Sequence, residues 1–149
     1  GRLFDAAAAI LGICTSVSYE AQAAMQLESA ATNWAHANPL PRPKTFKSFR
    51  DLFEILGEGE REIGERAWFF HVGLAGLLAN KTQELAEESQ ISTVGLTGGV
   101  ALNRLFSTQF THLLRKEGFK VLTHRTVPPN DGGLSLGQAW ATVLGASEG

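Results

Sequence analysis

The sequence has a single cysteine, Cys14, and its lysines and arginines are not clustered. One cysteine cannot form a disulfide within the chain, which favours a reducing compartment, and we expect a cytoplasmic location. With a net charge of −2, the chain lacks the basic surface that is typical of nucleic-acid binding. The longest apolar run, Ala67 to Ala79, contains His71 and is shorter than the roughly 20 residues of a membrane span. We therefore expect no nucleic acid and no membrane as partner.

Common catalytic and metal-binding patterns are also missing from the sequence. The four histidines, His36, His71, His112 and His124, include no pair at i and i+4, and no catalytic triad or acid–base pair is recognisable. We expect His71, in its apolar segment, to be a packed or a snorkelling side chain and not a metal ligand. Neither a G-x-G-x-x-G fingerprint nor a P-loop occurs.

The composition that is present fits one globular unit. Of 149 residues, 44% are hydrophobic and 19% are charged, which is enough apolar material for a core at this length. The chain starts directly in an apolar helical pattern, with Gly1 and not Met in front. We therefore expect residues 1–149 to form a single fragment of a longer protein.

Apolar periodicity predicts a mainly helical chain with two short strands. Helical spacing covers residues 3–11, 19–36, 46–56, 60–89, 101–116 and 134–144. Short apolar segments at 91–97 and 119–123 predict strands. Strand, helix and strand in this order form a right-handed parallel crossover, so the fold class is α/β, predominantly helical. Two strands are too few for an independent sheet, and we expect either further strands in a missing part or a fold held mainly by packed helices.

Two Gly-rich turns carry the strongest functional signal. Thr97-Gly98-Gly99 leaves the first predicted strand and opens a helix, and Asn130-Asp131-Gly132-Gly133 lies between the second strand and the last helix. Paired glycines let a ligand approach the backbone, and a helix N-terminus offers unpaired N–H donors to an anion. Because the turns follow neighbouring parallel strands, we expect them at one edge of the sheet, as part of a nucleotide or phosphate site.

Each of these interpretations has a structural alternative. The Gly98-Gly99 turn also fits a plain strand-to-helix connection, although Asn103, expected one turn into the helix, has an amide that can reach a ribose or an acyl phosphate. Asp131 fits either an N-cap or an oxygen ligand for a divalent cation. Asp5 reads as a solvated charge, and Gln22 as a cap at the start of its helix.

Four segments form a more specific set: GRLFDA at residues 1–6, SYEAQAAM at 18–25, LTGGV with NRL at 96–105, and PPNDGGL with LGQA at 128–139. Together they resemble the C-terminal end of the HypF family of hydrogenase-maturation carbamoyltransferases. More distantly, they are similar to the universal tRNA threonylcarbamoyladenosine synthase and to antibiotic O-carbamoyltransferases. The resemblance implies part of the second lobe of an actin/Hsp70/sugar-kinase fold, as the C-terminal portion of a Kae1-like nucleotide-binding domain.

The resemblance also implies roles for individual residues. Gly98 and Gly99 match the Gly-rich loop of the family, and Asn103 and Asp5 match residues that hold the ribose or an acyl-adenylate. Asp131 matches an aspartate that completes a metal site together with histidines that are absent from this chain. Gln22 matches a position where the related synthases carry a substrate-contacting glycine.

For the whole protein, the resemblance implies a carbamoyltransferase that uses ATP and carbamoyl phosphate through a carbamoyl-adenylate. The acceptor would be the C-terminal cysteine of a HypE-like protein, in the maturation of [NiFe] hydrogenase. Ala21 stands where the family usually has glycine, and Ala101-Leu102 replace Phe-Gln. Because the metal histidines are expected upstream of Gly1, we expect the chain alone to be inactive.

Two other functions fit the same sequence. One is an O-carbamoyltransferase that acts on a small-molecule hydroxyl. The other is a non-catalytic docking module, in which Phe46, Phe49 and Phe53 and the helix at 60–89 form the contact surface.

Overall fold

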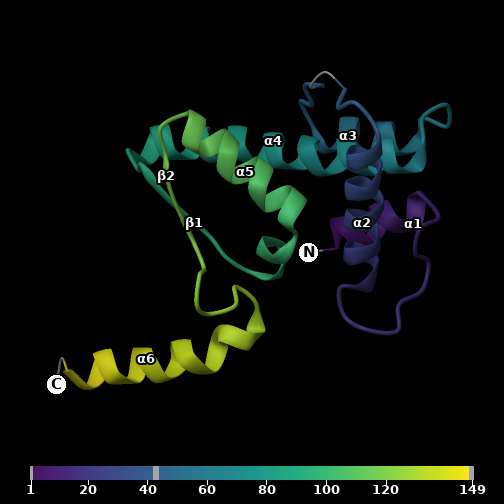
Figure 1. Cartoon of the computed structure of the whole chain (residues 1–149). Coiled ribbons are helices and arrows are strands. Elements are labelled where there is room, and N and C mark those ends of the chain that lie inside the picture. Colours follow the sequence, from purple (N-terminus) through teal and green to yellow (C-terminus); the bar gives the residue numbers. More distant parts are fainter. Residues whose placement is uncertain (1, 42–43, 148–149) are drawn as a thin grey trace.

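The computed structural model describes residues 2–41 and 44–147 (Figure 1). Its elements follow in the order α1 (Leu3–Ile10), α2 (Gln22–Ala37), α3 (Phe49–Gly57), α4 (Ile63–Ser89), β1 (Thr93–Leu96), η1 (Gly99–Leu102), α5 (Arg104–Lys116), β2 (Lys120–Thr123), η2 (Asp131–Gly133) and α6 (Leu134–Ser147), where η marks a short 3-10 helix. The mainly helical α/β class that the sequence predicts is confirmed.

Strands β1 and β2 form a parallel pair, with Thr93 opposite Lys120 and Leu96 opposite Thr123. Helix α5 connects the two strands and packs against both β2 and α4 (Figure 1). The predicted strand–helix–strand unit is therefore present. Its carboxyl edge, at Leu96 and Thr123, leads into the two Gly-rich turns.

Helix α4 is the centre of the fold and packs against α2, α3 and α5 (Figure 1). Every residue from Ala67 to Ala75 except Val72 is buried, as expected for a helix that is surrounded by other helices. Other helices supply further side chains of the same core: Leu27, Leu52, Ile55, Leu56, Phe106 and Leu114.

Two glycines of α4 are required by close packing. A Cβ at Gly73 would lie 2.5 Å from Cδ2 of Leu52 and 2.6 Å from the Phe46 ring, and a Cβ at Gly64 would lie 2.5 Å from Cβ of Trp34. The helix accepts glycine at these two positions because neighbouring side chains occupy the space. At Gly76 a Cβ would meet nothing within 4 Å, so packing does not explain that glycine.

Several helices begin later than the apolar pattern predicts. Helix α2 starts at Gln22 and not at residue 19, because Ala21 has the left-handed φ of 62° and interrupts the helical path. Helix α4 starts at Ile63 and not at residue 60. Helix α5 starts at Arg104 and not at residue 101, since η1 precedes it and Asn103 is extended.

The aromatic face proposed for a docking module is largely internal. Phe46 is only 5% exposed and Phe53 is partly buried against the core, while Phe49 is exposed. A continuous phenylalanine surface is therefore absent from the described part of α3 and the segment before it. None of the described helices is long and apolar enough to cross a membrane.

Helix α6 extends away from the packed helices, as Figure 1 shows at the yellow end of the chain. Its contacts are chiefly with η2. Its apolar side chains are largely open to solvent, including Leu134, Leu136, Trp140 and Val143.

Candidate nucleotide-binding site

The two Gly-rich turns are joined directly. The backbone N–H of Gly98 donates a hydrogen bond to the carbonyl oxygen of Pro129 at 2.8 Å, and the hydroxyl of Thr97 donates to the same oxygen at 3.3 Å. Nε2 of His124, which follows β2, lies 3.0 Å from Oγ1 of Thr97. The expectation that both turns meet at one edge of the sheet is confirmed.

The first turn leaves its backbone open to approach. Gly98 has a φ of 88°, a conformation that residues with a side chain rarely adopt. A Cβ built at Gly98 or at Gly99 would meet nothing within 4 Å. Gly99 has no positive φ, so its own conformation would accept alanine. The empty space above Gly99 is therefore space that a ligand can fill.

The second turn is tighter and presents Asp131. A Cβ at Gly133 would lie 2.7 Å from the carbonyl oxygen of Pro128, so the close return of the chain requires glycine there. Asp131 is exposed, and within residues 2–41 and 44–147 no hydrogen bond or ion pair to its carboxylate is found. The alternative of a side-chain N-cap is thus not realised, and the carboxylate faces solvent beside the joined turns.

The sequence predicts that Asn103 lies one turn inside the helix. In the structure it is instead the N-cap of α5. Its Oδ1 accepts a hydrogen bond from the backbone N–H of Phe106 at 2.9 Å. Its Nδ2 lies 3.0 Å from Nε2 of His71, and the residue is only 8% exposed. Each amide atom keeps one further bonding position, a second N–H on Nδ2 and a second lone pair on Oδ1.

The N-terminus of α5 is already occupied by an anionic group of the same chain. Oε1 of Glu28, on α2, accepts hydrogen bonds from the backbone N–H groups of Arg104 at 2.6 Å and Leu105 at 3.1 Å. With Phe106 bonded to Asn103, the first three amides of the helix are paired. The expectation that this helix offers unpaired donors to a phosphate is therefore wrong, because a carboxylate fills that place.

Phe4, the residue before Asp5, contacts the first turn of α5. Phe4 packs edge-on against Phe106, with ring centroids 6.4 Å apart. The Asp5 carboxylate accepts a hydrogen bond from Nε of Arg2 at 3.0 Å, so it is an ion-paired and not simply a solvated charge. Asp5 also lines a surface pocket of about 400 Å³, whose wall includes Cys14.

Gln22 closes a loop instead of capping its helix. Its Oε1 accepts a hydrogen bond from the backbone N–H of Ser18 at 2.6 Å. In the described part of the chain, no hydrogen bond or ion pair joins Gln22 or Asp5 to the two Gly-rich turns. The structure thus brings together Gly98, Gly99 and the Asp131 turn, and it places Asp5 and Gln22 on separate elements.

Glu28 and His71 form hydrogen bonds with the start of α5 and with Asn103. The sequence did not indicate either residue as part of the site. Their partners are 76 and 32 residues away in the chain, so no local spacing could have revealed these contacts. Of the two alternatives predicted for His71, the packed side chain is the one observed, since the residue is fully buried and does not reach solvent. Burial lowers its pKa from 6.5 to about 4, and the hydrogen bond to the Ala67 carbonyl opposes that shift only in part.

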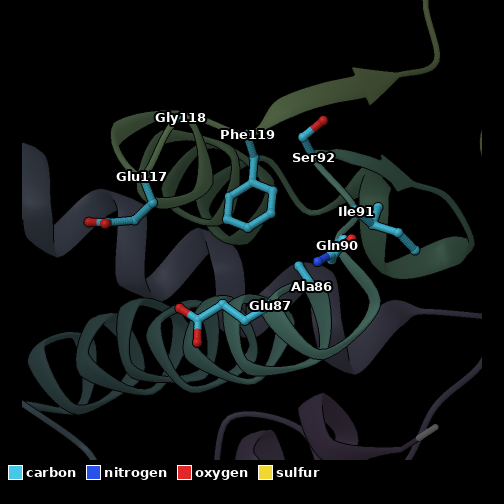
Figure 2. Close-up of a pocket in the computed structure, with 8 residues that line it drawn as sticks. All are labelled: Ala86, Glu87, Gln90, Ile91, Ser92, Glu117, Gly118 and Phe119. Carbon is cyan, nitrogen blue, oxygen red and sulfur yellow. The ribbon is translucent and has the colours of Figure 1, made fainter.

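A second pocket, of about 260 Å³, lies at the opposite edge of the sheet (Figure 2). Ser92 and Phe119, which precede β1 and β2, form part of its wall together with Ala86 of α4. In Figure 2 the Phe119 ring points toward α4. Ligands of parallel sheets collect at the carboxyl ends of the strands. This pocket lies at the amino ends, so it is not part of the candidate site.

Comparison with known proteins identifies the family. The sequence profile described as "Carbamoyltransferase, Kae1-like Domain, second subdomain" matches residues 1–138. Carbamoyltransferase HypF of Rhodobacter capsulatus is 42% identical over 140 residues, which is 93% of this chain and 18% of that protein. The probable carbamoyltransferase HypF of Methanocaldococcus jannaschii is 31% identical, over 97% of this chain and 20% of that protein.

Solved structures give the same result. A full-length HypF crystallised in a phosphate- and nucleotide-bound form superposes with a TM-score of 0.76 at 32% identity, over 93% of this chain and 19% of that one. HypF of T. kodakarensis superposes with a TM-score of 0.81 at 28% identity, over 99% of this chain and 20% of that one. The chain thus spans about a fifth of the length of these relatives. It belongs to the HypF carbamoyltransferase family and corresponds to the second subdomain of its Kae1-like domain.

Proposed function

We propose that this chain forms the part of a carbamoyltransferase that receives the phosphates of ATP. The observation that carries the proposal is the hydrogen bond between Gly98 and Pro129, which holds two Gly-rich turns together at the carboxyl edge of the strands. The open backbone of Gly99, next to that bond, supports it, because phosphate oxygens need close access to N–H groups. A relative of the same fold has been crystallised with phosphate and nucleotide.

The residues present fit a nucleotide better than they fit a complete metal site. The space above Gly99 suits a phosphate group, and Asn103 keeps one N–H that can be shared with a ligand. By contrast, the described residues contain no group of three or more His, Cys, Asp or Glu side chains that could hold a metal ion. Asp131 would supply one oxygen ligand, and the other ligands would come from outside this chain.

In the natural protein, carbamoyl phosphate would lose inorganic phosphate by hydrolysis, and the resulting carbamate would displace pyrophosphate from ATP to give a carbamoyl-adenylate. Attack of the acceptor on the carbamoyl carbon would then release AMP. Gly99 would bind a phosphate oxygen through its backbone N–H, because the N–H of Gly98 is already bonded to the Pro129 carbonyl. Asp5 and Gln22 would face the nucleoside or the acyl group from α1 and the start of α2. The acceptor would be the C-terminal cysteine thiolate of a HypE-like protein, in [NiFe] hydrogenase maturation, and the reaction would occur in the cytoplasm.

The test uses Gly99→Ala in the natural protein that contains this sequence. Alanine fits the conformation of Gly99, so the melting temperature should stay the same, but its methyl group would fill the space assigned to phosphate. We expect the Kd for a non-hydrolysable ATP analogue, measured by titration calorimetry, to rise at least tenfold. Gly59→Ala is the matched control, because a Cβ there also meets nothing within 4 Å and Gly59 lies in the turn before α4. Equal affinity in both variants would contradict the proposal.

The acceptor is tested separately. The natural protein, ATP and carbamoyl phosphate are incubated either with a HypE-like protein or with a small hydroxyl compound. We expect the mass of one carbamoyl group to be added at the C-terminal cysteine of the protein acceptor. Addition only to the hydroxyl compound would favour an O-carbamoyltransferase instead.

A further inference from the structure

A chain of buried hydrogen bonds links the middle of α4 to the start of α5. Nδ1 of His71 lies 2.7 Å from the carbonyl oxygen of Ala67, and Nε2 of His71 lies 3.0 Å from Nδ2 of Asn103. Oδ1 of Asn103 then accepts from the N–H of Phe106. Both side chains are buried, at 0% and 8% exposure, so solvent does not compete for these bonds.

The backbone groups at the two ends fix which atom donates and which accepts in each of these hydrogen bonds. The Phe106 N–H can only donate, so the amide oxygen of Asn103 faces it and the NH₂ group faces His71. The Ala67 carbonyl can only accept, so Nδ1 of His71 carries the proton. His71 is therefore the neutral Nδ1–H tautomer, and its Nε2 is the acceptor that Asn103 requires.

Asn103 also contacts the segment that follows the two glycines. Its backbone N–H donates to the Val100 carbonyl at 3.0 Å, and its side chain begins α5. Ser107, one turn into α5, donates from its hydroxyl to the Ala101 carbonyl at 2.9 Å. A displaced Asn103 would therefore move the segment that runs from Gly98 to α5.

We propose that His71 is a positioning residue of the nucleotide site, which acts through Asn103 to hold the Gly98–Leu102 segment in its binding conformation. This inference rests on the proposed function. His71 does not itself touch a ligand, because it is fully enclosed by α4, α5 and the Phe4 and Phe70 rings. Replacing it should loosen the start of α5 and weaken nucleotide binding together.

The decisive comparison is between His71→Phe and His71→Gln in the natural protein. Phenylalanine keeps a ring among its aromatic neighbours but offers no acceptor, so Nδ2 of Asn103 would be left unpaired. Glutamine offers a carbonyl oxygen in place of Nε2. We expect His71→Phe to raise the Kd for a non-hydrolysable ATP analogue about tenfold, and His71→Gln to stay within about threefold of the unsubstituted protein.

Phe69→Leu is the control for a general loss of packing. Phe69 is also buried on α4, but its ring contacts are with Phe46, Trp68 and the Arg61 guanidinium, and none of these is Asn103 or His71. We expect this variant to melt at a lower temperature with its nucleotide affinity unchanged. If Phe69→Leu weakens binding as much as His71→Phe, or if His71→Gln does not restore binding, the positioning role is wrong.

Two further measurements need no nucleotide. Nitrogen-15 NMR of His71 should show protonated Nδ1 and unprotonated Nε2 at neutral pH, and the opposite tautomer or a charged ring would overturn the proposal. Amide hydrogen exchange at Phe106 should be faster in His71→Phe, while exchange at Leu114, at the far end of α5, should not change. If the unsubstituted protein binds no nucleotide, the proposed function and the ligand half of this inference fail together. The NMR and exchange results would still decide whether His71 holds Asn103.

Discussion

Ala21 and Gln90 are the non-glycine residues with positive φ in the part of the chain that the structure describes. Ala21, with φ of 62°, ends the loop that precedes α2 and keeps the helix from starting earlier. An L-residue with a Cβ is strained in this conformation, whereas glycine is not. A glycine at this position would therefore remove the strain.

We expect Ala21→Gly to stabilise the chain. The relief of left-handed strain outweighs the greater freedom of glycine in the unfolded state, so the free energy of unfolding should rise by about 0.5–1 kcal/mol. Urea denaturation measures the change. Ala24→Gly, inside α2, is the control and should lower stability by roughly 0.5–1 kcal/mol. A loss of stability in Ala21→Gly would show that the left-handed turn is not formed.

Because His71 is buried, we expect the free energy of unfolding to fall in acid. Its pKa is about 4 in the folded chain and near 6.5 when unfolded, so the unfolded state takes up the proton first. Its contribution to stability is complete above pH 6.5 and is lost as the pH falls toward 4. The loss should reach roughly 3 kcal/mol, from about 1.4 kcal/mol per pKa unit.

The comparison variant for this effect is His71→Gln, because carboxylates and the other histidines also titrate in this range. The difference in unfolding free energy between the two proteins should shrink as the pH is lowered from 7 to 4. A difference that stays constant with pH would mean that His71 titrates normally in the folded chain.

Helix α5 depends on a carboxylate from α2. Glu28 pairs the N–H groups of Arg104 and Leu105, while Asn103 caps Phe106. The contact therefore completes the N-terminus of one helix with a side chain from another, and it joins α2 to the element that follows the Gly98 turn. Such a bond also complements the positive end of the helix dipole.

We expect Glu28→Ala to lower the free energy of unfolding by about 1–2 kcal/mol, since two backbone donors lose an anionic acceptor. Glu28→Gln should lose less, because its amide oxygen still accepts a hydrogen bond. Glu54→Ala, at an exposed position on α3, is the control and should change stability little. The midpoint of urea denaturation gives all three values. Equal losses in Glu28→Ala and Glu54→Ala would contradict the capping role.

The prediction of elements succeeded where one property of the sequence decided the outcome. Within the described residues, apolar spacing located the helices α1 to α6 but not the short helices η1 and η2, and the short apolar segments at 91–97 and 119–123 contain β1 and β2. The starts of α2 and α5 were misplaced because caps depend on single residues, Ala21 and Asn103, whose conformation the apolar pattern does not encode.

At the scale of the whole molecule, helix α6 leaves most of its apolar side chains exposed to solvent. Helix α6 carries Leu136 and Trp140 at 55% and 63% exposure and extends away from the other helices (Figure 1). Contiguous apolar surface of this kind favours self-association of a chain in water.

We expect the isolated chain to bind a hydrophobic dye and to associate at higher concentration. Replacing Leu136 and Trp140 together by glutamine should reduce both effects, because these side chains are exposed and support no described core contact. The melting temperature should hardly change. Dye fluorescence and light scattering measure the effects, and values equal to those of the unsubstituted chain would show that α6 is covered in solution.

The sequence by itself determined the helical character, the parallel crossover and the position of the two Gly-rich turns, because apolar period and glycine content act locally. Its motifs also identified the family. Only the tertiary structure decided what the polar groups do: Asn103 is bonded to His71, and the first amides of α5 are bonded to Glu28. These pairings join residues far apart in the chain, and burial, which sets their strength, exists only after the helices have packed.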